Sequence, residues 1–142
     1  MRFSKLPAQR AASAPHAPCL ADTDLRLSNT EFNARVLSAA QVFADSGVGA
    51  GDVVALMLPN QVEFAVAMFA AWHLGAAVTP INPMITPKEA THQIHDSKAK
   101  LIINSTGETV VDNVPSLAVD TLHGGTQHLG TPVDDTAALV VR

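Results

Sequence analysis

Residues 47–83 read GVGAGDVVALMLPNQVEFAVAMFAAWHLGAAVTPINP, and this stretch decides the fold. After a glycine-rich turn, residues 53–58 are all apolar. A strand that is apolar at every position is typical of a parallel sheet covered by helices on both faces. Residues 62–74 are apolar almost all round, which predicts a buried helix, and Gly75 ends it. A second apolar strand follows at 77–79, so the stretch predicts a strand–helix–strand unit.

Helix-start signals lie on both sides of this stretch. Before it, Ser28 and Glu31 have the spacing of a capping box, in which each side chain satisfies a backbone N–H of the other residue. Apolar residues then recur at helical spacing to about residue 46, and Gly47 suits a left-handed cap. After it, Thr86 and Glu89 repeat the capping box ahead of a helix that we expect to run to about residue 96.

Shorter elements extend the pattern in both directions. Residues 6–14 predict a short helix, and residues 19–21 and 25–27 flank a polar turn, which predicts a small hairpin. Residues 100–104 are a third buried strand. Beyond residue 106 the signal weakens, and we expect a short strand at 116–119, a glycine-rich loop over 123–132 and a final strand at 137–141.

The alternation of strands and helices predicts an α/β fold with a partial, mostly parallel sheet and crossover helices. We expect the strands at 53–58, 77–79 and 101–103 to be parallel members of one sheet. The helices at 62–74 and 87–96 are then the two crossovers.

Composition narrows the class of protein. The chain has 142 residues, enough for one domain with a real core. A hydrophobic content of 47% and a formal net charge of -4 predict a soluble globular protein. Because there is no Lys/Arg stripe, no Tyr and one Trp, we expect no nucleic-acid partner. Cys19 is the one cysteine and cannot form an internal disulfide, which fits a reducing compartment.

The amino terminus has one feature of a targeting segment. Arg2, Lys5 and Arg10 precede the first acid, Asp22, and such an acid-poor start is also found in transit peptides. No apolar core of a secretory signal follows it. The apolar stretch over 62–77 is too short to cross a bilayer. We therefore expect a cytoplasmic protein with no membrane span.

Two groups of residues invite chemical hypotheses. Gly47, Gly49 and Gly51 precede a strand, whereas a dinucleotide loop follows a strand and opens a helix, so a connecting turn is favoured. His92 and His95 share a helix face with Asp96 beside them, but two ligands are not a metal site.

The remaining candidates have simpler interpretations. His73 is expected to be a packed or hydrogen-bonded core residue, and Cys19 a small buried apolar one. His123 and His128 flank a Gly-Gly-Thr segment that lacks the Gly-Lys-Ser/Thr ending of a phosphate loop, so we expect a plain, flexible loop there. A catalytic Ser/His/Asp group stays open, although no local motif supports one.

Several segments together resemble the amino-terminal region of the acyl-adenylate-forming ligases. The resemblance covers roughly residues 6–142, and Asn82-Pro83 followed by Thr86-Pro-Lys-Glu89 looks most like the acyl-CoA synthetase and 4-coumarate-CoA-ligase-like branch. The family-like segments are Leu27-Ser-Asn-Thr-Glu-Phe32, Gly47-Val-Gly-Ala-Gly-Asp52, Leu58-Pro-Asn60, Gly75-Ala-Ala-Val-Thr-Pro-Ile-Asn-Pro83 and Ser97-Lys-Ala-Lys-Leu-Ile-Ile103.

The resemblance implies an ATP-dependent, two-step reaction. A fatty or aryl acid is activated to an acyl-adenylate and then transferred to coenzyme A, with ATP, Mg²⁺ and coenzyme A as cofactors of the full-length protein. The family's phosphate loop, its aromatic-Gly-x-Thr-Glu segment and its catalytic lysine have no counterpart here, and Lys88, Lys98 and Lys100 do not match that lysine's motif. We therefore assign no residue of this chain to catalysis, cofactor binding or metal binding.

The resemblance also implies a division of the chain. Residues 1–24 would form the amino-terminal helix and the start of the hairpin, and residues 25–142 the first part of an incomplete AMP-binding α/β domain. Its partners would be the rest of the ligase large domain and the carboxyl-terminal domain. We expect the chain alone to be inactive, marginally stable and prone to aggregate, with Trp72, Leu74 and the strand at 137–141 unusually exposed. The alternative is a self-standing, non-catalytic α/β binding or interaction module.

Overall fold

The computed structural model describes residues 3–133, and the strand predicted at 137–141 lies outside them. Its centre is a four-stranded sheet in the order β4-β3-β5-β6. β3 (Val53–Met57) pairs in parallel with β4 (Ala77–Pro80) and with β5 (Leu101–Asn104). β5 also pairs in parallel with β6 (Ser116–Ala118). The predicted parallel sheet is confirmed.

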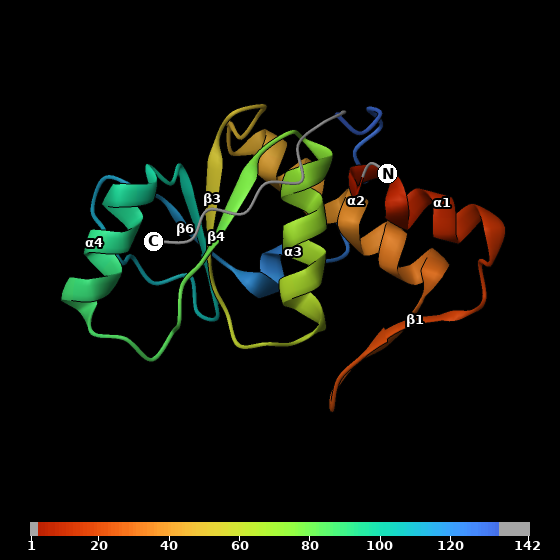
Figure 1. Ribbon diagram of the computed structural model, residues 1–142, viewed down its shortest axis with the longest axis horizontal. Helices are drawn as coiled ribbons and strands as arrows, with labels where there is room; N and C mark the ends of the chain where they lie inside the picture. The colour runs from red at the N-terminus through yellow and green to blue at the C-terminus, as the bar shows by residue number, and fades with distance from the viewer. Residues whose placement is uncertain (1–2, 134–142) are drawn as a thin grey trace.

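Helices cover the two faces of this sheet (Figure 1). On one face lie α2 (Asn29–Asp45) and α3 (Val62–His73), and on the other lies α4 (Pro87–Ser97). Successive side chains of β3 point to opposite faces. Val54 and Leu56 therefore join the larger apolar core beneath α2 and α3, whereas Ala55 joins a smaller core with Ile94 of α4.

The helix caps follow the sequence signals. Ser28 caps α2 by accepting a hydrogen bond from Glu31 N, while Glu31 Oε1 accepts from Ser28 N at 2.9 Å, so the capping box is complete. Thr86 caps α4 by accepting from Glu89 N, but no bond from Thr86 N to the Glu89 side chain is found among the described residues, so only half of the predicted second capping box is formed. α4 ends at Ser97, and Lys98 takes the left-handed cap conformation with φ 58°.

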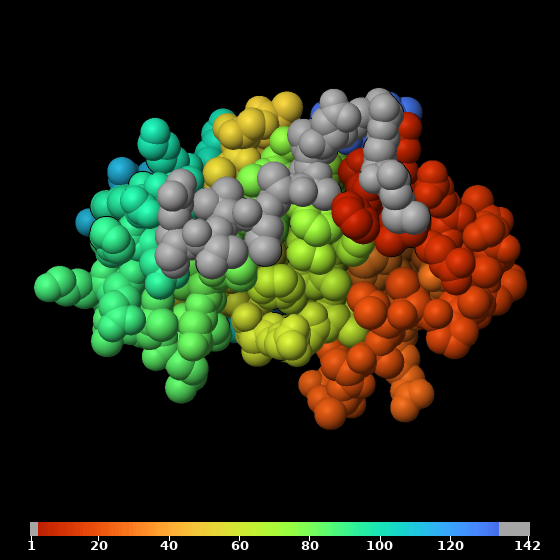
Figure 2. All heavy atoms as spheres, in the orientation of Figure 1, coloured from red at the N-terminus to blue at the C-terminus, as the bar shows by residue number. Residues whose placement is uncertain are grey.

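The amino-terminal segment forms one end of the molecule (Figure 2). It contains a 3-10 turn η1 (Phe3–Lys5), α1 (Leu6–Ser13) and the antiparallel hairpin of β1 (Pro18–Ala21) and β2 (Arg26–Ser28). The hairpin end, in orange, projects from the body, and α4, in green, lies at the opposite end. The predicted short helix and hairpin are confirmed.

The expected exposure of the α3 end is wrong for Leu74. Its side chain is only 8% exposed and belongs to the larger core, because α3 packs against α2 and η1. Trp72 is half-buried, with its ring 5.2 Å from that of Phe69 and 6.3 Å from that of Phe3. Within residues 3–133, no helix combines the length and apolar composition needed to cross a membrane.

Candidate functional site at the carboxyl edge of the sheet

The strand order marks the carboxyl edge of the sheet as the place to look for a site. The chain leaves β3 for β4 on one side and then returns past β3 to β5 on the other. In open α/β sheets, ligands bind outside the carboxyl ends of the strands at such a reversal. The segments at this edge are the start of α3, the loop after β5, and the 3-10 turn η2 (Val119–Leu122) that follows β6.

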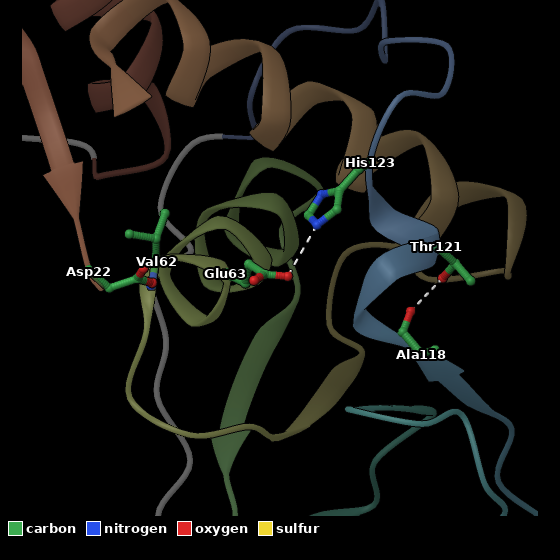
Figure 3. A network of polar contacts seen from close by, with 6 residues as sticks. All are labelled: Asp22, Val62, Glu63, Ala118, Thr121 and His123. Atoms are coloured by element: carbon green, nitrogen blue, oxygen red, sulfur yellow. Dashed lines mark hydrogen bonds and ion pairs between the residues drawn. The ribbon is translucent and has the colours of Figure 1, made fainter. Parts of the chain in front are cut away.

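The start of α3 is capped by a residue from the hairpin. Gln61, at the N-cap position, makes no side-chain cap. Instead Val62 N donates to Asp22 Oδ2 at 2.9 Å (Figure 3). Asp22 Oδ1 also accepts from the backbone N–H groups of Asp24 and Leu25. These hydrogen bonds lower the pKa of the Asp22 carboxyl, and the bond from Val62 has the largest effect. Asp22 thus ties the hairpin tip to the helix.

A histidine and two carboxylates meet beside this helix start. Glu63 lies in the first turn of α3, and its Oε2 is 3.1 Å from His123 Nε2 (Figure 3). Thr121 Oγ1 donates to Ala118 O at 2.7 Å, across the turn that carries the chain to His123. Asp120 belongs to the same turn, and one ligand atom from each of Glu63, Asp120 and His123 lies within 4.8 Å of the others.

This cluster is partly removed from water. The Glu63 and His123 side chains are 21% and 26% exposed, and Asp120 is exposed. Among the described residues, neither carboxylate has an ion pair with a lysine or arginine. His123 Nδ1 is buried and has no hydrogen-bond partner among the described residues. The arrangement can hold a proton between His123 and Glu63 or bind a cation.

The other polar side chains at this edge make hydrogen bonds within the loops in which they lie. Asn104, at the end of β5, accepts from Gly107 N at 2.6 Å and donates to Glu108 O at 3.0 Å. Asn82 accepts from Met84 N at 2.9 Å. These amides shape the turns in which they lie.

The other histidines considered in the sequence analysis lie elsewhere. His92 and His95 are exposed on α4. His73 is only 3% exposed, as expected for a core residue, and its Nε2 lies 3.1 Å from His128 Nδ1. Burial and then the charge of His128 lower the pKa of His73.

His128 belongs to residues 123–133, which we call the strap. The strap is a loop, as predicted, and it is fastened at several points. His128 N donates to Leu37 O at 3.0 Å, Val133 N donates to His73 O at 3.0 Å, and Ser4 Oγ donates to Val133 O at 2.9 Å. Sequence reasoning missed these contacts because they join distant parts of the chain.

Cys19 lies apart from the carboxyl edge, between two open hollows of about 370 and 300 Å³ beside the hairpin. Its thiol is half-buried, and burial raises its pKa despite the nearby Arg10. A raised pKa disfavours the thiolate, which is the nucleophilic form. The interpretation of Cys19 as a packing residue is therefore supported.

The fold places the chain among the amino-terminal domains of adenylate-forming ligases. The N-terminal domain of FACL13 from Mycobacterium tuberculosis superposes with a TM-score of 0.79 and 26% identity, covering 89% of this chain and 37% of that one. A Mycobacterium tuberculosis fatty acyl CoA synthetase gives the same TM-score and identity over 94% of this chain and 30% of that chain.

Sequence comparison identifies the family. Residues 7–139 match the AMP-binding enzyme family, and the chain belongs to it. Rice (Oryza sativa subsp. japonica) 4-coumarate–CoA ligase 2 is 46% identical over 96 residues, covering 66% of this chain and 17% of that protein. Long-chain-fatty-acid–CoA ligase FadD13 of Mycobacterium tuberculosis is 35% identical over 97 residues, covering 67% of this chain and 19% of that protein. The chain spans less than a fifth of the length of these curated relatives.

Proposed function

We propose that this chain is the opening part of the large domain of an AMP-forming acid–thiol ligase. The observation that carries the proposal is the family match over residues 7–139. Its relatives include a 4-coumarate–CoA ligase and a long-chain-fatty-acid–CoA ligase. In the proposed reaction, a fatty or aryl carboxylate attacks the α-phosphate of ATP and releases pyrophosphate. The thiol of coenzyme A then attacks the acyl carbon and releases AMP.

ATP, Mg²⁺ and coenzyme A belong to the whole ligase in this proposal. Within residues 3–133, no glycine-rich loop joins the end of a strand to the start of a helix, the arrangement that cradles phosphates. The turn at Gly47–Gly51 precedes β3, and the strap carbonyl of Gly125 accepts from Ser38 on α2. No step of the ATP chemistry is therefore assigned to these residues, and we propose that the chain alone is inactive.

The proposal gives the chain a structural role with defined partners. Residues 1–24 supply a helix and the start of the hairpin, and residues 25–142 supply the first strands and helices of the AMP-binding domain. The rest of that domain and a carboxyl-terminal domain are the partners, and a cytoplasmic location suits the single cysteine.

A chimera tests the proposal. Residues 7–133 would replace the corresponding segment of the rice 4-coumarate–CoA ligase, and ATP–pyrophosphate exchange would be measured with 4-coumarate. If the chain is the equivalent building block, the chimera retains exchange well above background. The same assay on the 142-residue chain alone, with fatty and aryl acids, should give background only.

A chimera in which the same segment is deleted is the control for background. A folded, monodisperse chimera whose exchange equals that of the deletion would contradict the proposal. Exchange by the purified chain alone would contradict the proposal that this chain is inactive without the rest of the ligase.

A further inference from the structure

We propose that Glu63, Asp120 and His123 form a binding site for one divalent transition-metal ion of the zinc type. The three residues come from α3, from η2 and from the first position of the strap. One ligand atom of each lies within 4.8 Å of the other two. Figure 3 shows the Glu63 carboxylate and the His123 ring pointing toward one another from facing elements.

The distances suit a metal after a small movement of one side chain. Zinc bonds of about 2.0–2.2 Å put neighbouring ligand atoms of a tetrahedral site roughly 3.3 Å apart. Glu63 Oε2 and His123 Nε2 already lie 3.1 Å apart. Asp120 is exposed, so we expect its carboxylate to rotate inward and complete the set of three donors around one ion.

The charges favour a cation at this point. With a neutral imidazole, two carboxylates face one another without a lysine or arginine paired to either of them among residues 3–133. Partial burial of Glu63 and His123 weakens the screening by water. Protonating His123 would balance one carboxylate, whereas a divalent cation balances both.

The donor set selects the kind of metal. Mg²⁺ and Ca²⁺ prefer sites made entirely of oxygen, while an imidazole with carboxylates suits Zn²⁺ and its neighbours Co²⁺ and Ni²⁺. A metal-bound histidine is usually supported by a hydrogen bond at its second nitrogen. His123 Nδ1 has no such partner in the described part of the chain. We therefore expect moderate affinity, with a Kd on the order of micromolar rather than that of structural zinc sites.

Bound metal would join elements that are otherwise held by one polar contact at this place. It would link the first turn of α3 to the turn after β6 and to the beginning of the strap. Because the unfolded chain cannot bring these three side chains together, metal binding would stabilise the fold.

The test is a metal titration of the purified chain after removal of any tag and treatment with chelator. Isothermal titration with Zn²⁺ should give one site per chain, and Co²⁺ should give the visible absorption of a low-symmetry site. The variant Asp120→Asn should raise the Zn²⁺ Kd at least about tenfold, since it removes one ligand. Asp120 is exposed, so this variant keeps its fold, and circular dichroism checks that it does.

Two further variants keep the test decisive. Glu63→Gln, which has nearly the same shape, should weaken binding as much as Asp120→Asn. The matched control is His92→Gln with His95→Gln on the exposed face of α4, which should leave the Kd unchanged.

The proposal is overturned by any of three results. The wild-type chain could show no Zn²⁺ binding below millimolar concentration. Asp120→Asn and Glu63→Gln could both bind as tightly as wild type. The α4 double variant could abolish binding, which would place the metal on His92 and His95.

Discussion

Asp22 stands at the tip of the hairpin, 40 residues before the amide that it caps. Its carboxylate accepts three backbone hydrogen bonds, and together they stabilise the ionised form. The folded-state pKa of Asp22 is therefore lowered. Its contribution to stability is present above the ordinary pKa of an aspartate and is lost as the pH falls through the lowered value.

Substitutions at Asp22 separate its charge from its hydrogen bonds. Asp22→Asn keeps an oxygen that can accept and should lower the urea midpoint slightly at pH 7, whereas Asp22→Ala should lower it more. As the pH falls through the lowered pKa of Asp22, the wild type and Asp22→Asn should converge, because the wild-type carboxyl becomes protonated. Urea unfolding at pH 7 and over a series of acidic pH values measures this. An Asn variant whose deficit stays constant across pH would contradict the charge argument.

His73 and His128 give the fold a second acid-sensitive contact. His128 Nδ1 accepts from Gly130 N at 3.2 Å and lies 3.1 Å from His73 Nε2. The lowered pKa of His73 means that the fold favours its neutral form. The unfolded chain then binds more protons just below about pH 6.5. Stability is thus complete above that pH and falls as the pH drops toward the folded-state value.

The variant His128→Gln should flatten this loss. Glutamine removes the charge of His128, which is the second cause of the lowered His73 pKa, while burial of His73 remains. The unfolding free energy should therefore change somewhat less between pH 7 and pH 5 than in wild type. His16→Gln, at an exposed position outside the strap, should keep the wild-type slope. Equal slopes in all three proteins would exclude the histidine pair as the cause.

The residue-scale contacts mark the limit of sequence reasoning. The sequence indicated a core histidine at position 73 but not its partner, which lies 55 residues away. The sequence predicted a plain loop around His123 and did not indicate its partner Glu63, which is 60 residues distant. Such pairs depend on the order of strands in the sheet, and local spacing carries no information about that order.

At the scale of elements, the capping box of α2 offers a clean energetic prediction. Ser28→Ala removes the acceptor of Glu31 N and should lower the free energy of unfolding by about 1 kcal/mol. Thr30→Ala, an exposed position in the first turn of the same helix, should change it by less than about 0.5 kcal/mol. Urea denaturation of the two variants measures the difference, and equal effects would show that the box contributes nothing.

Alanine variants at three glycines distinguish the effect of backbone strain on stability from that of steric crowding. Gly49 lies outside the positive-φ region and has open space where a Cβ would be, so Gly49→Ala should be neutral or slightly stabilising. Gly124 has φ +71° with open space, and its alanine variant should lose about 1 kcal/mol from strain alone. Gly75 has φ +81°, and a Cβ would meet Val133 Cγ1 at 3.0 Å and Ala50 Cβ at 3.1 Å.

Gly75→Ala should therefore be the most damaging of the three, at about 2 kcal/mol or more. The measurement is the free energy of unfolding of all four proteins under one condition. If Gly75→Ala lost no more than Gly124→Ala, the crowding between α3 and the strap would be refuted.

The elements themselves were largely predictable because each carries a local cause. The apolar run at 53–58 corresponds to β3 (Val53–Met57), and the capped helices begin where their Ser and Thr caps stand. Two local details were not foreseen. β4 continues to Pro80, which lies at an edge of the described sheet where its missing N–H is tolerated, and Lys98 ends α4 in place of a glycine. The predicted strand at 137–141 lies outside the described residues.

At the scale of the whole molecule, two apolar cores of unequal size flank one sheet. The alternation of elements predicted parallel strands with crossover helices, and that is confirmed. It did not predict that β3 lies between β4 and β5, because either edge of β3 could accept the next strand. That order creates the carboxyl edge at which Glu63, Asp120 and His123 gather.

The last prediction concerns the chain as a separate protein. In the described part of the sheet, β4 and β6 each have a neighbour on one side. Met84 and Leu129 are 87% and 94% exposed, and Phe3 is 48% exposed. Unpaired strand edges and exposed apolar side chains promote association, and the proposed partner is the rest of a ligase. We therefore expect concentration-dependent self-association and a free energy of unfolding below about 5 kcal/mol.

Light scattering combined with urea denaturation measures both quantities. The double variant Met84→Gln with Leu129→Gln should reduce scattering while leaving the far-ultraviolet circular dichroism unchanged, since both positions are exposed. A monodisperse monomer with one sharp transition of ordinary stability would contradict the prediction. That result would favour the alternative, a self-standing α/β module whose two cores are closed by its own helices.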